Sequence, residues 1–251
     1  MLHHKFIGNQ NSNHCIIFLH EGLGCVDMWK DYPKELCQLL NMQGLVYDRA
    51  GYGKSKGDLT TRRADYLHKG ANELFNLIHT LQLESKHIIL YGHSDGGSIA
   101  LIFAARYPNL CKLMITEAAH VFVEQITLDG IKPAEIAFKE GKLNGLKKYH
   151  GENFTTVFYA WVNIWNHSTF LNWNIETELQ NIICPQLCIQ GIDDQYGTLK
   201  QVESIKRNTK GNTTIFTPDT CGHSPFKENK IDVLGKVITF IENTDSYAHS
   251  L

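Results

Sequence analysis

A serine flanked by glycines, between a strand pattern and a helical pattern, is the feature that most limits the fold of this chain. The run Ile88 to Gly92 is apolar and β-branched, which predicts a strand buried on both faces. It continues into Gly92-His93-Ser94-Asp95-Gly96-Gly97 and then into a helical pattern over Ser98 to Tyr107. Small residues two positions either side of a serine let strand and helix pass closely around a sharp turn. The pattern predicts a nucleophile elbow with Ser94 at its tip.

Short apolar runs alternate with helical patterns along most of the chain. This alternation is typical of βαβ units and predicts an α/β fold with a mainly parallel sheet flanked by helices. The predicted strands are Cys15 to His20, Leu45 to Arg49, Ile88 to Gly92, Leu113 to Thr116, Leu187 to Gln190 and Thr214 to Thr217. The predicted helices are Asp65 to Leu81, Ser98 to Tyr107, Leu199 to Asn208 and Lys230 to Glu242.

The stretch 120–179 breaks this rhythm. It is rich in Trp, Tyr, Phe and His and has no run with the periodicity of a strand. We expect a helical cap over 120–179, inserted into a core formed by 1–119 and 180–251. No repeat or low-complexity tract interrupts the chain, so the whole is predicted to be a single domain.

A serine nucleophile needs a base within hydrogen-bond reach and an acid that orients the base. Asp193 and Asp194 follow the predicted strand Leu187 to Gln190, and His223 follows the last predicted strand. Both loops should lie at the carboxyl edge of the sheet, where Ser94 also lies. We predict Ser94, Asp194 and His223 as the catalytic residues, with Glu117, at the end of another strand, as the alternative acid.

Acyl transfer also needs hydrogen-bond donors aimed at the developing oxyanion. One predicted donor is the backbone N–H of Asp95, directly after the nucleophile. The second is the N–H of Gly22, in the loop His20-Glu21-Gly22-Leu23-Gly24 that follows the first predicted strand. A plain glycine turn without this role is the alternative for that loop.

Over nearly its whole length the chain resembles the α/β-hydrolase superfamily. The matching landmarks are the His20 to Gly24 loop, Asp48-Arg49-Ala50-Gly51-Tyr52-Gly53-Lys54-Ser55, the Ser94 elbow, the Asp194 turn and the Gly222-His223 loop. The resemblance implies a variable cap, no cofactor, and hydrolysis of esters, amides or related bonds. Glu21 departs from the family, which commonly has glycine after the histidine of this loop. Ser94-Asp95-Gly96-Gly97 is similar to the elbow of valacyclovir-hydrolase-like esterases.

The small-molecule substrate is expected to be a small carboxylic ester. Because its carboxylate would sit beside the pocket, Asp95 could bind an amine on that ester, although an acid is also favourable at a helix N-terminus for its own sake. Trp161 and Trp165 are predicted to contact the acyl group, with Phe154, Tyr159 and Trp173 as further candidates. Aromatic residues at helical spacing can equally be simple core.

Composition excludes several other classes of protein. The formal net charge is −2 with scattered basic residues, which argues against a nucleic-acid partner. The 7 cysteines form no C-x-x-C pair, so we expect reduced, mostly buried thiols. We expect no metal, because His20, His93, His120 and His223 have no ligand spacing. No apolar signal core follows Met1 and no long apolar run occurs, so we expect a soluble, cytoplasmic protein that does not bind membranes. We expect it to be a monomer or a homodimer.

Two other functions remain open at the level of sequence. The first is a carbon–carbon bond hydrolase or a lyase like those of the menaquinone pathway, using the same triad on a carboxylated substrate. Its cap would offer cations, and candidates are Lys132, Lys139, Lys142, Lys147 and Lys148. The second is a ligand receptor that keeps the triad without turning over. Hydrolysis is favoured because elbow, acid, base and oxyanion loop occur in a workable order.

Overall fold

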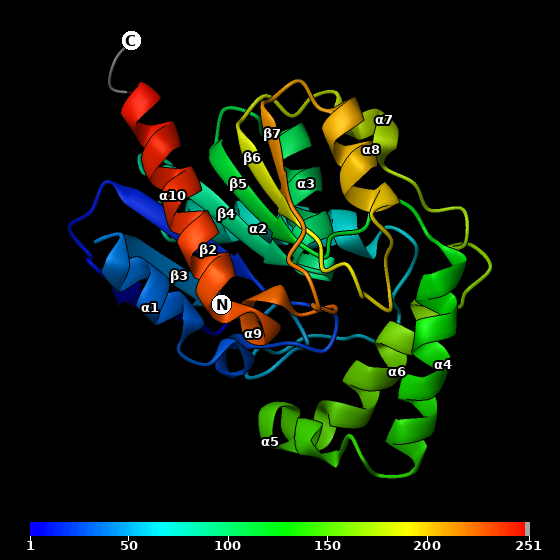
Figure 1. The fold of residues 1–251 in the computed structure, drawn as a ribbon. Helices are drawn as coiled ribbons and strands as arrows, with labels where there is room; N and C mark the ends of the chain where they lie inside the picture. Colours follow the sequence, from blue (N-terminus) through cyan, green and yellow to red (C-terminus); the bar gives the residue numbers. More distant parts are fainter. Residues whose placement is uncertain (249–251) are drawn as a thin grey trace.

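A mainly parallel sheet forms the centre of the molecule. The computed structural model describes residues 1–248 and places a seven-stranded sheet in the order β1-β3-β2-β4-β5-β6-β7 (Figure 1). The strands are β1 (His4–Gly8), β2 (His14–Leu19), β3 (Gln43–Tyr47), β4 (His87–His93), β5 (Cys111–Glu117), β6 (Gln186–Ile189) and β7 (Thr213–Phe216). All the pairs from β3 to β7 are parallel, so the carboxyl ends of these strands share one edge. The predicted fold class is confirmed.

The strand β1 was not predicted from the sequence. It pairs antiparallel with β3 at the edge of the sheet, with His4 opposite Tyr47. None of its residues is fully buried, so the stretch lacks the apolar run by which the other strands were predicted. Its position is determined by hydrogen bonds to β3 rather than by burial of its own side chains.

Helices cover both faces of the sheet. On one face lie α1 (Tyr32–Leu39) and α10 (Lys230–Ala248), and on the other lie α2 (Tyr66–Thr80), α3 (Asp95–Arg106) and α8 (Lys200–Asn208) (Figure 1). The short helix α9 (Pro225–Glu228) precedes α10, and a 3₁₀ helix (Val26–Trp29) precedes α1. No bounds were predicted from the sequence for the helix α1, because its eight residues form a short pattern with a proline in the first turn. No helix in the described residues is long and apolar enough to cross a bilayer.

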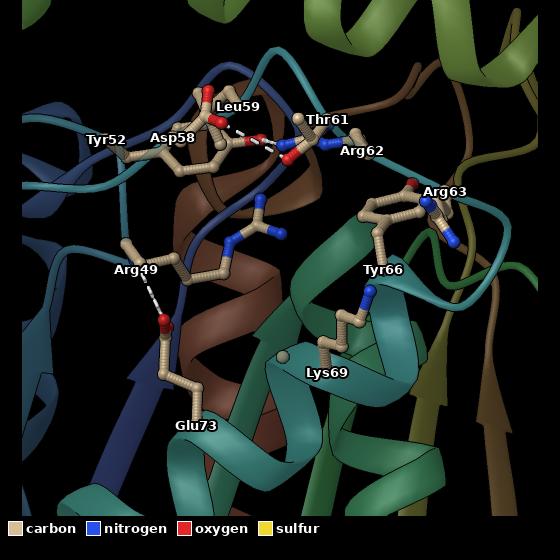
Figure 2. Close-up of a pocket in the computed structure, with 12 residues that line it drawn as sticks. Arg49, Tyr52, Asp58, Leu59, Thr61, Arg62, Arg63, Tyr66, Lys69 and Glu73 are labelled. Carbon is tan, nitrogen blue, oxygen red and sulfur yellow. Dashed lines mark hydrogen bonds between the residues drawn. The ribbon is translucent and has the colours of Figure 1, made fainter.

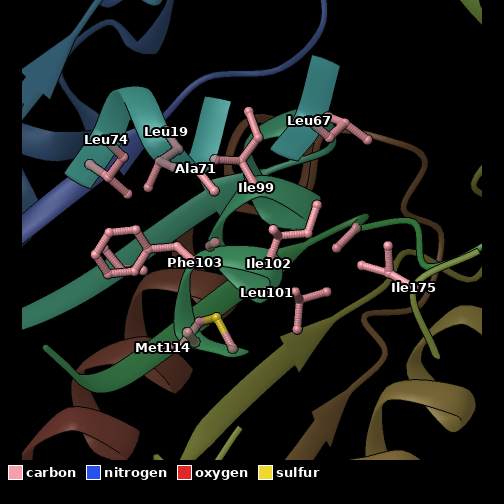
Figure 3. Close-up of a cluster of buried hydrophobic side chains, with 14 of the residues drawn as sticks. Leu19, Leu67, Ala71, Leu74, Ile99, Leu101, Ile102, Phe103, Met114 and Ile175 are labelled. Carbon is pink, nitrogen blue, oxygen red and sulfur yellow. The ribbon is translucent and has the colours of Figure 1, made fainter. Parts of the chain in front are cut away.

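The strand β2 shows how the two layers of core form. Cys15, Ile17 and Leu19 face the core under α2 and α3, while Ile16 and Phe18 face the core under α1 and α10. Alternate side chains of a strand point to opposite faces, so a central parallel strand must be apolar on both. In Figure 3, α3 packs between α2 and the sheet. Every residue of α3 except Arg106 is buried, which holds the helix after Ser94 rigidly in place.

Residues 120–179 are helical apart from turns and one isolated bridge between Phe122 and Asn174. They contain α4 (Gln125–Lys139), α5 (Lys147–His150), α6 (Phe154–Trp165) and α7 (Glu176–Leu179), with 3₁₀ turns at Asn144–Leu146 and Gly151–Asn153. In Figure 1, α4, α5 and α6 project beyond the sheet. The helix α7 packs instead against α3 and α8. The division into core and cap stays a prediction.

Candidate active site

Ser94 sits on a strained turn between β4 and α3. Its backbone has φ 53° and ψ −118°, a conformation that residues with a side chain rarely adopt. A Cβ added at Gly92 would lie 2.3 Å from the Gly96 carbonyl oxygen, and one at Gly96 would lie 2.0 Å from the Leu19 carbonyl oxygen. Only glycine fits at either position, because backbone atoms cannot move aside. The turn therefore holds the Ser94 side chain out at the carboxyl edge of the sheet.

His223 and Asp194 reach Ser94 from the loops after β7 and β6. His223 Nε2 lies 2.9 Å from Ser94 Oγ. His223 Nδ1 lies 2.8 Å from Oδ1 and 2.9 Å from Oδ2 of Asp194. These contacts join residues 129 and 29 positions apart in the chain. The structure thus brings the three predicted catalytic residues together in the order serine, histidine, carboxylate.

The Asp194 carboxylate is buried and fully hydrogen-bonded. It accepts the Tyr196 N–H at 2.8 Å and the Gln190 side-chain amide at 2.6 Å, besides His223. Burial alone would raise the pKa of this carboxyl, but the charge and hydrogen bond of His223 and the Tyr196 N–H outweigh it and hold the pKa below its ordinary value. The neighbouring Asp193 is exposed. Position 194 is therefore the one that presents an ionised oxygen pair to the imidazole.

Glu117, the alternative acid, does not contact His223. Its carboxylate accepts the Tyr91 hydroxyl and, at 3.0 Å, the Phe226 N–H. Burial raises the pKa of Glu117 to about 7. The Glu117 carboxylate therefore links β4 to the segment after the His223 loop and makes no hydrogen bond to any of the three predicted catalytic residues. The Glu117 backbone carbonyl, by contrast, contacts the elbow, where it accepts the Ser94 N–H at 2.8 Å.

His93 and Glu228 hold the His223 loop. From the sequence, His93 was considered only as a metal ligand and Glu228 was not considered. His93 Nε2 lies 2.7 Å from the His223 carbonyl oxygen. Burial, with a smaller effect of nearby His223, lowers the pKa of His93 to about 3, so the ring is neutral and Nε2 carries the donated proton. The Glu228 carboxylate accepts the N–H groups of Gly222 at 2.7 Å and Ser224 at 2.9 Å. The place of His93 inside the elbow motif was the one available sequence signal.

The two backbone N–H groups predicted as oxyanion donors are without an acceptor in the described residues. Asp95 is the first residue of α3, so its N–H has no intrahelical acceptor. The Gly22 N–H also makes no hydrogen bond within the described part of the chain. Glu21, the departure from the family pattern, turns its carboxylate back to the Leu23 N–H at 2.5 Å. The role of Gly22 and Asp95 as oxyanion donors stays a prediction.

The Asp95 carboxylate is already paired. Its side chain is 1% exposed, and Oδ2 accepts Arg49 Nη1 at 3.3 Å while Oδ1 accepts the Tyr66 hydroxyl at 2.9 Å. Arg49 Nη2 also donates to the Glu21 carbonyl oxygen at 2.8 Å, which links the elbow to the predicted oxyanion loop. The carboxylate is therefore not free to bind a substrate amine, contrary to the expectation from sequence.

The two predicted substrate-binding tryptophans lie in different surroundings. Trp161 is partly exposed, and a Cβ on Gly22 would approach its Cδ1 to 2.7 Å. Its ring lies 5.9 Å from that of Tyr196, which lies 4.8 Å from that of His223. Trp165 is 2% exposed and packs at 5.1 Å against both His120 and Phe170. Trp161 thus borders the predicted oxyanion loop, whereas Trp165 is part of the core.

No group of three or more histidine, cysteine or carboxylate side chains in residues 1–248 is arranged to hold a metal ion. The histidines considered from sequence bond to protein groups instead. His20 Nε2 accepts the Arg49 N–H at 3.1 Å, and His120 Nε2 lies 3.0 Å from the Tyr196 carbonyl oxygen. Both support loops at the same edge of the sheet as Ser94.

Known proteins resemble this chain in sequence and in fold. A family model of the alpha/beta hydrolase fold matches residues 15–174. The human serine hydrolase BPHL is 26% identical over 226 residues, covering 87% of this chain and 75% of that protein. MGS-M2, an alpha/beta hydrolase from a deep-sea metagenome, has TM-score 0.78 at 18% identity and covers 96% of this chain and 94% of its own. A thermophilic esterase from Thermogutta terrifontis has TM-score 0.73 at 18% identity, with 97% and 93% covered. The chain therefore belongs to the α/β-hydrolase fold family.

Proposed function

We propose that the protein is a serine hydrolase that cleaves small carboxylic esters through an acyl-enzyme intermediate. The observation that carries this proposal is the continuous hydrogen-bonded path from Ser94 Oγ through His223 to the Asp194 carboxylate. A serine hydroxyl is a weak nucleophile unless a base takes its proton as it attacks. A neutral imidazole with Nε2 toward the serine and Nδ1–H toward a carboxylate supplies that base.

In the proposed mechanism, Ser94 Oγ attacks the ester carbonyl carbon while His223 Nε2 takes the hydroxyl proton. Asp194 stabilises the imidazolium formed, and the N–H groups of Asp95 and Gly22 stabilise the oxyanion. The imidazolium then protonates the departing alkoxide, which leaves as the alcohol. Water, activated by the same imidazole, attacks the acyl-enzyme and releases the carboxylic acid with Ser94 restored.

The surroundings of Ser94 support a small substrate. Ser94 is 9% exposed. Trp161 lies against Gly22, and the Tyr196 ring lies beside that of His223. A short acyl group needs less movement of these aromatic rings than a long chain does, so we propose a preference for short acyl groups.

Glu21 is the carboxylate best placed to meet an amine on such an ester. It is half-buried, and within the described residues its carboxylate accepts one hydrogen bond, from the Leu23 N–H. Burial and the charge of Glu21 raise the pKa of Tyr196, which places this charge near the ring that flanks His223. Amino-acid esters should then be cleaved with a higher kcat/KM than their des-amino analogues, and Glu21→Gln should remove that difference. An amine that gives no gain in the wild type contradicts this part of the proposal.

The alternative substrates with carboxylates gain no support from the cap. The five lysines considered from sequence are all exposed. Four of them pair with neighbouring glutamates or aspartates on the surface: Lys132, Lys139, Lys142 and Lys147. Exposed ion pairs of this kind contribute little to stability, and they give these lysines partners on the surface rather than at Ser94. Ester hydrolysis is therefore the function we put forward.

A burst assay with a panel of p-nitrophenyl esters tests the proposal. Wild type should release about one equivalent of p-nitrophenol in the burst and then turn over steadily. Ser94→Ala should lose both phases, while Ser85→Ala, a change at an exposed serine, should retain them. A wild-type burst without later turnover would favour the receptor function. Turnover that persists in Ser94→Ala would exclude Ser94 as the nucleophile.

A further inference from the structure

A cavity of about 210 Å³ lies between the segment after β3 and the start of α2. Basic side chains gather around it, namely Arg49, Arg62, Arg63 and Lys69, together with the rings of Tyr52 and Tyr66 (Figure 2). Ser94 and His223 do not line it. The cavity is therefore a feature separate from the proposed site of ester cleavage.

The carboxylates around this cavity are bound to other groups. Glu73 accepts the Ala50 N–H at 3.0 and 3.2 Å, and Asp58 accepts the N–H and hydroxyl of Thr60 at 2.8 and 2.6 Å. Asp95 is paired with Arg49. Within the described residues no ion pair joins Arg62 or Arg63 to a carboxylate. Four cationic side chains line the cavity against two carboxylates, Asp58 and Glu73, so positive charge is in excess.

Arg62 is held in place without an ion pair of its own, because Asp95, the carboxylate whose charge acts on it, is already paired with Arg49. Arg62 Nη2 donates to the Tyr52 hydroxyl, and the Arg62 guanidinium carbon lies 4.6 Å from the Tyr66 ring centre. Arg62 Nη1 and Arg49 Nε are shielded from solvent and have no hydrogen-bond partner in the described part of the chain. Shielded guanidinium N–H groups without an acceptor destabilise a fold, whereas an anion bound beside them would accept their hydrogen bonds.

We propose that this cavity is a binding site for a small anionic group, a phosphate or a carboxylate, held by Arg62 and Arg63 with Lys69 at the rim. Two guanidinium groups match the paired oxygens of either anion, and Lys69 adds a mobile cation. Lys69 pairs with Asp65 at 3.1 Å, but both side chains are more than half exposed, so this pair opens easily. The volume suits a small anion rather than a large cofactor.

Calorimetric titration with inorganic phosphate and with malonate, at ionic strength held constant with sodium chloride, tests the site. Wild type should bind at least one of them saturably at one equivalent. Arg62→Gln and Arg63→Gln should each weaken binding by about tenfold or more, as expected for loss of a charge-assisted contact. Arg207→Gln removes an exposed charge from α8 and should change nothing.

Phosphate binding without malonate binding would identify a phosphate group as the ligand, and the reverse would identify a carboxylate. If Arg62→Gln does not fold, Arg63→Gln decides, because Arg63 is exposed. The inference is overturned if wild type binds neither anion saturably, or if Arg207→Gln weakens binding as much as Arg63→Gln. Ser94→Ala should bind the anion as tightly as wild type does. The titration can therefore be interpreted even if the ester-hydrolase proposal fails.

Discussion

Replacing Asp194 with asparagine keeps the shape of the side chain and removes its charge. The carboxylate accepts hydrogen bonds from His223, the Tyr196 N–H and the Gln190 amide. An asparagine keeps one accepting oxygen and places an NH₂ group where the second oxygen stood. If the oxygen keeps the contacts to His223 and Tyr196, the new NH₂ group faces Gln190.

Gln190 can adapt to this change. Its Oε1 has no hydrogen-bond partner within the described residues, so rotating the amide by half a turn lets Oε1 accept from the new NH₂ group. The rotation breaks one hydrogen bond, from Gln190 Nε2 to the Gly197 carbonyl oxygen at 3.1 Å. Losing one such bond should lower the free energy of unfolding by about 1–2 kcal/mol, which leaves the protein folded.

The effect on catalysis should be much larger. Without the negative charge, the imidazolium that forms as Ser94 attacks loses its stabilisation, and kcat/KM should fall by about 10³–10⁴-fold. Asp193→Asn is the matched control, because Asp193 is exposed and adjacent. It should keep kcat/KM and change the unfolding free energy by less than about 0.5 kcal/mol. The measurements are p-nitrophenyl ester kinetics and urea unfolding followed by circular dichroism.

Two results would refute this reasoning. If folded Asp194→Asn retains kcat/KM within tenfold of wild type, the carboxylate has no role in the reaction. If Asp193→Asn loses as much activity as Asp194→Asn, the loop as a whole matters and the specific contact does not.

Four further changes test the fold and the pocket. Gly96→Ala should lower the free energy of unfolding by about 3 kcal/mol or more, because its Cβ would lie 2.0 Å from a backbone oxygen of β2. Gly145→Ala is the control: a Cβ there would have nothing within 4 Å, so the same urea titration should show no change in stability. Glu117 has a pKa raised to about 7 in the fold, so the folded state binds its proton more tightly than the unfolded chain and wild-type stability declines as pH rises toward 7. Glu117→Gln lacks this proton, so its stability relative to wild type should increase by on the order of 1–3 kcal/mol from pH 5 to pH 8, and a constant difference would contradict the assignment. Trp165→Ala, at a position 2% exposed, should lose about 3–5 kcal/mol of unfolding free energy. Trp161→Ala should instead raise kcat/KM for longer acyl esters relative to acetate; equal effects on all chain lengths would place Trp161 outside the acyl pocket.

The sequence alone determined the order and type of most elements. Parallel strands buried on both faces are apolar throughout, and helices repeat every three to four residues, so local patterns identify them. Glycine is required on either side of Ser94 in the elbow, because an added Cβ would clash with backbone atoms there. The loops of Asp194 and His223 were predicted at the right edge because parallel strands share a carboxyl edge. By contrast, β1 has no pattern of its own and exists through pairing with β3.

Only the tertiary structure decided which carboxylates are free and which are bound. Glu117 ends β5 and Asp194 lies in the loop after the neighbouring strand β6, yet Asp194 contacts the imidazole whereas Glu117 contacts Tyr91 and Phe226. The pairing of Asp95 with Arg49 was equally hidden, because the two residues lie 46 positions apart in the chain. The periodicity of helices and strands depends on residues that are neighbours in the sequence, so it can be predicted from the sequence. Hydrogen bonds and ion pairs act over a few ångströms between distant segments, so they are known only once the chain has folded.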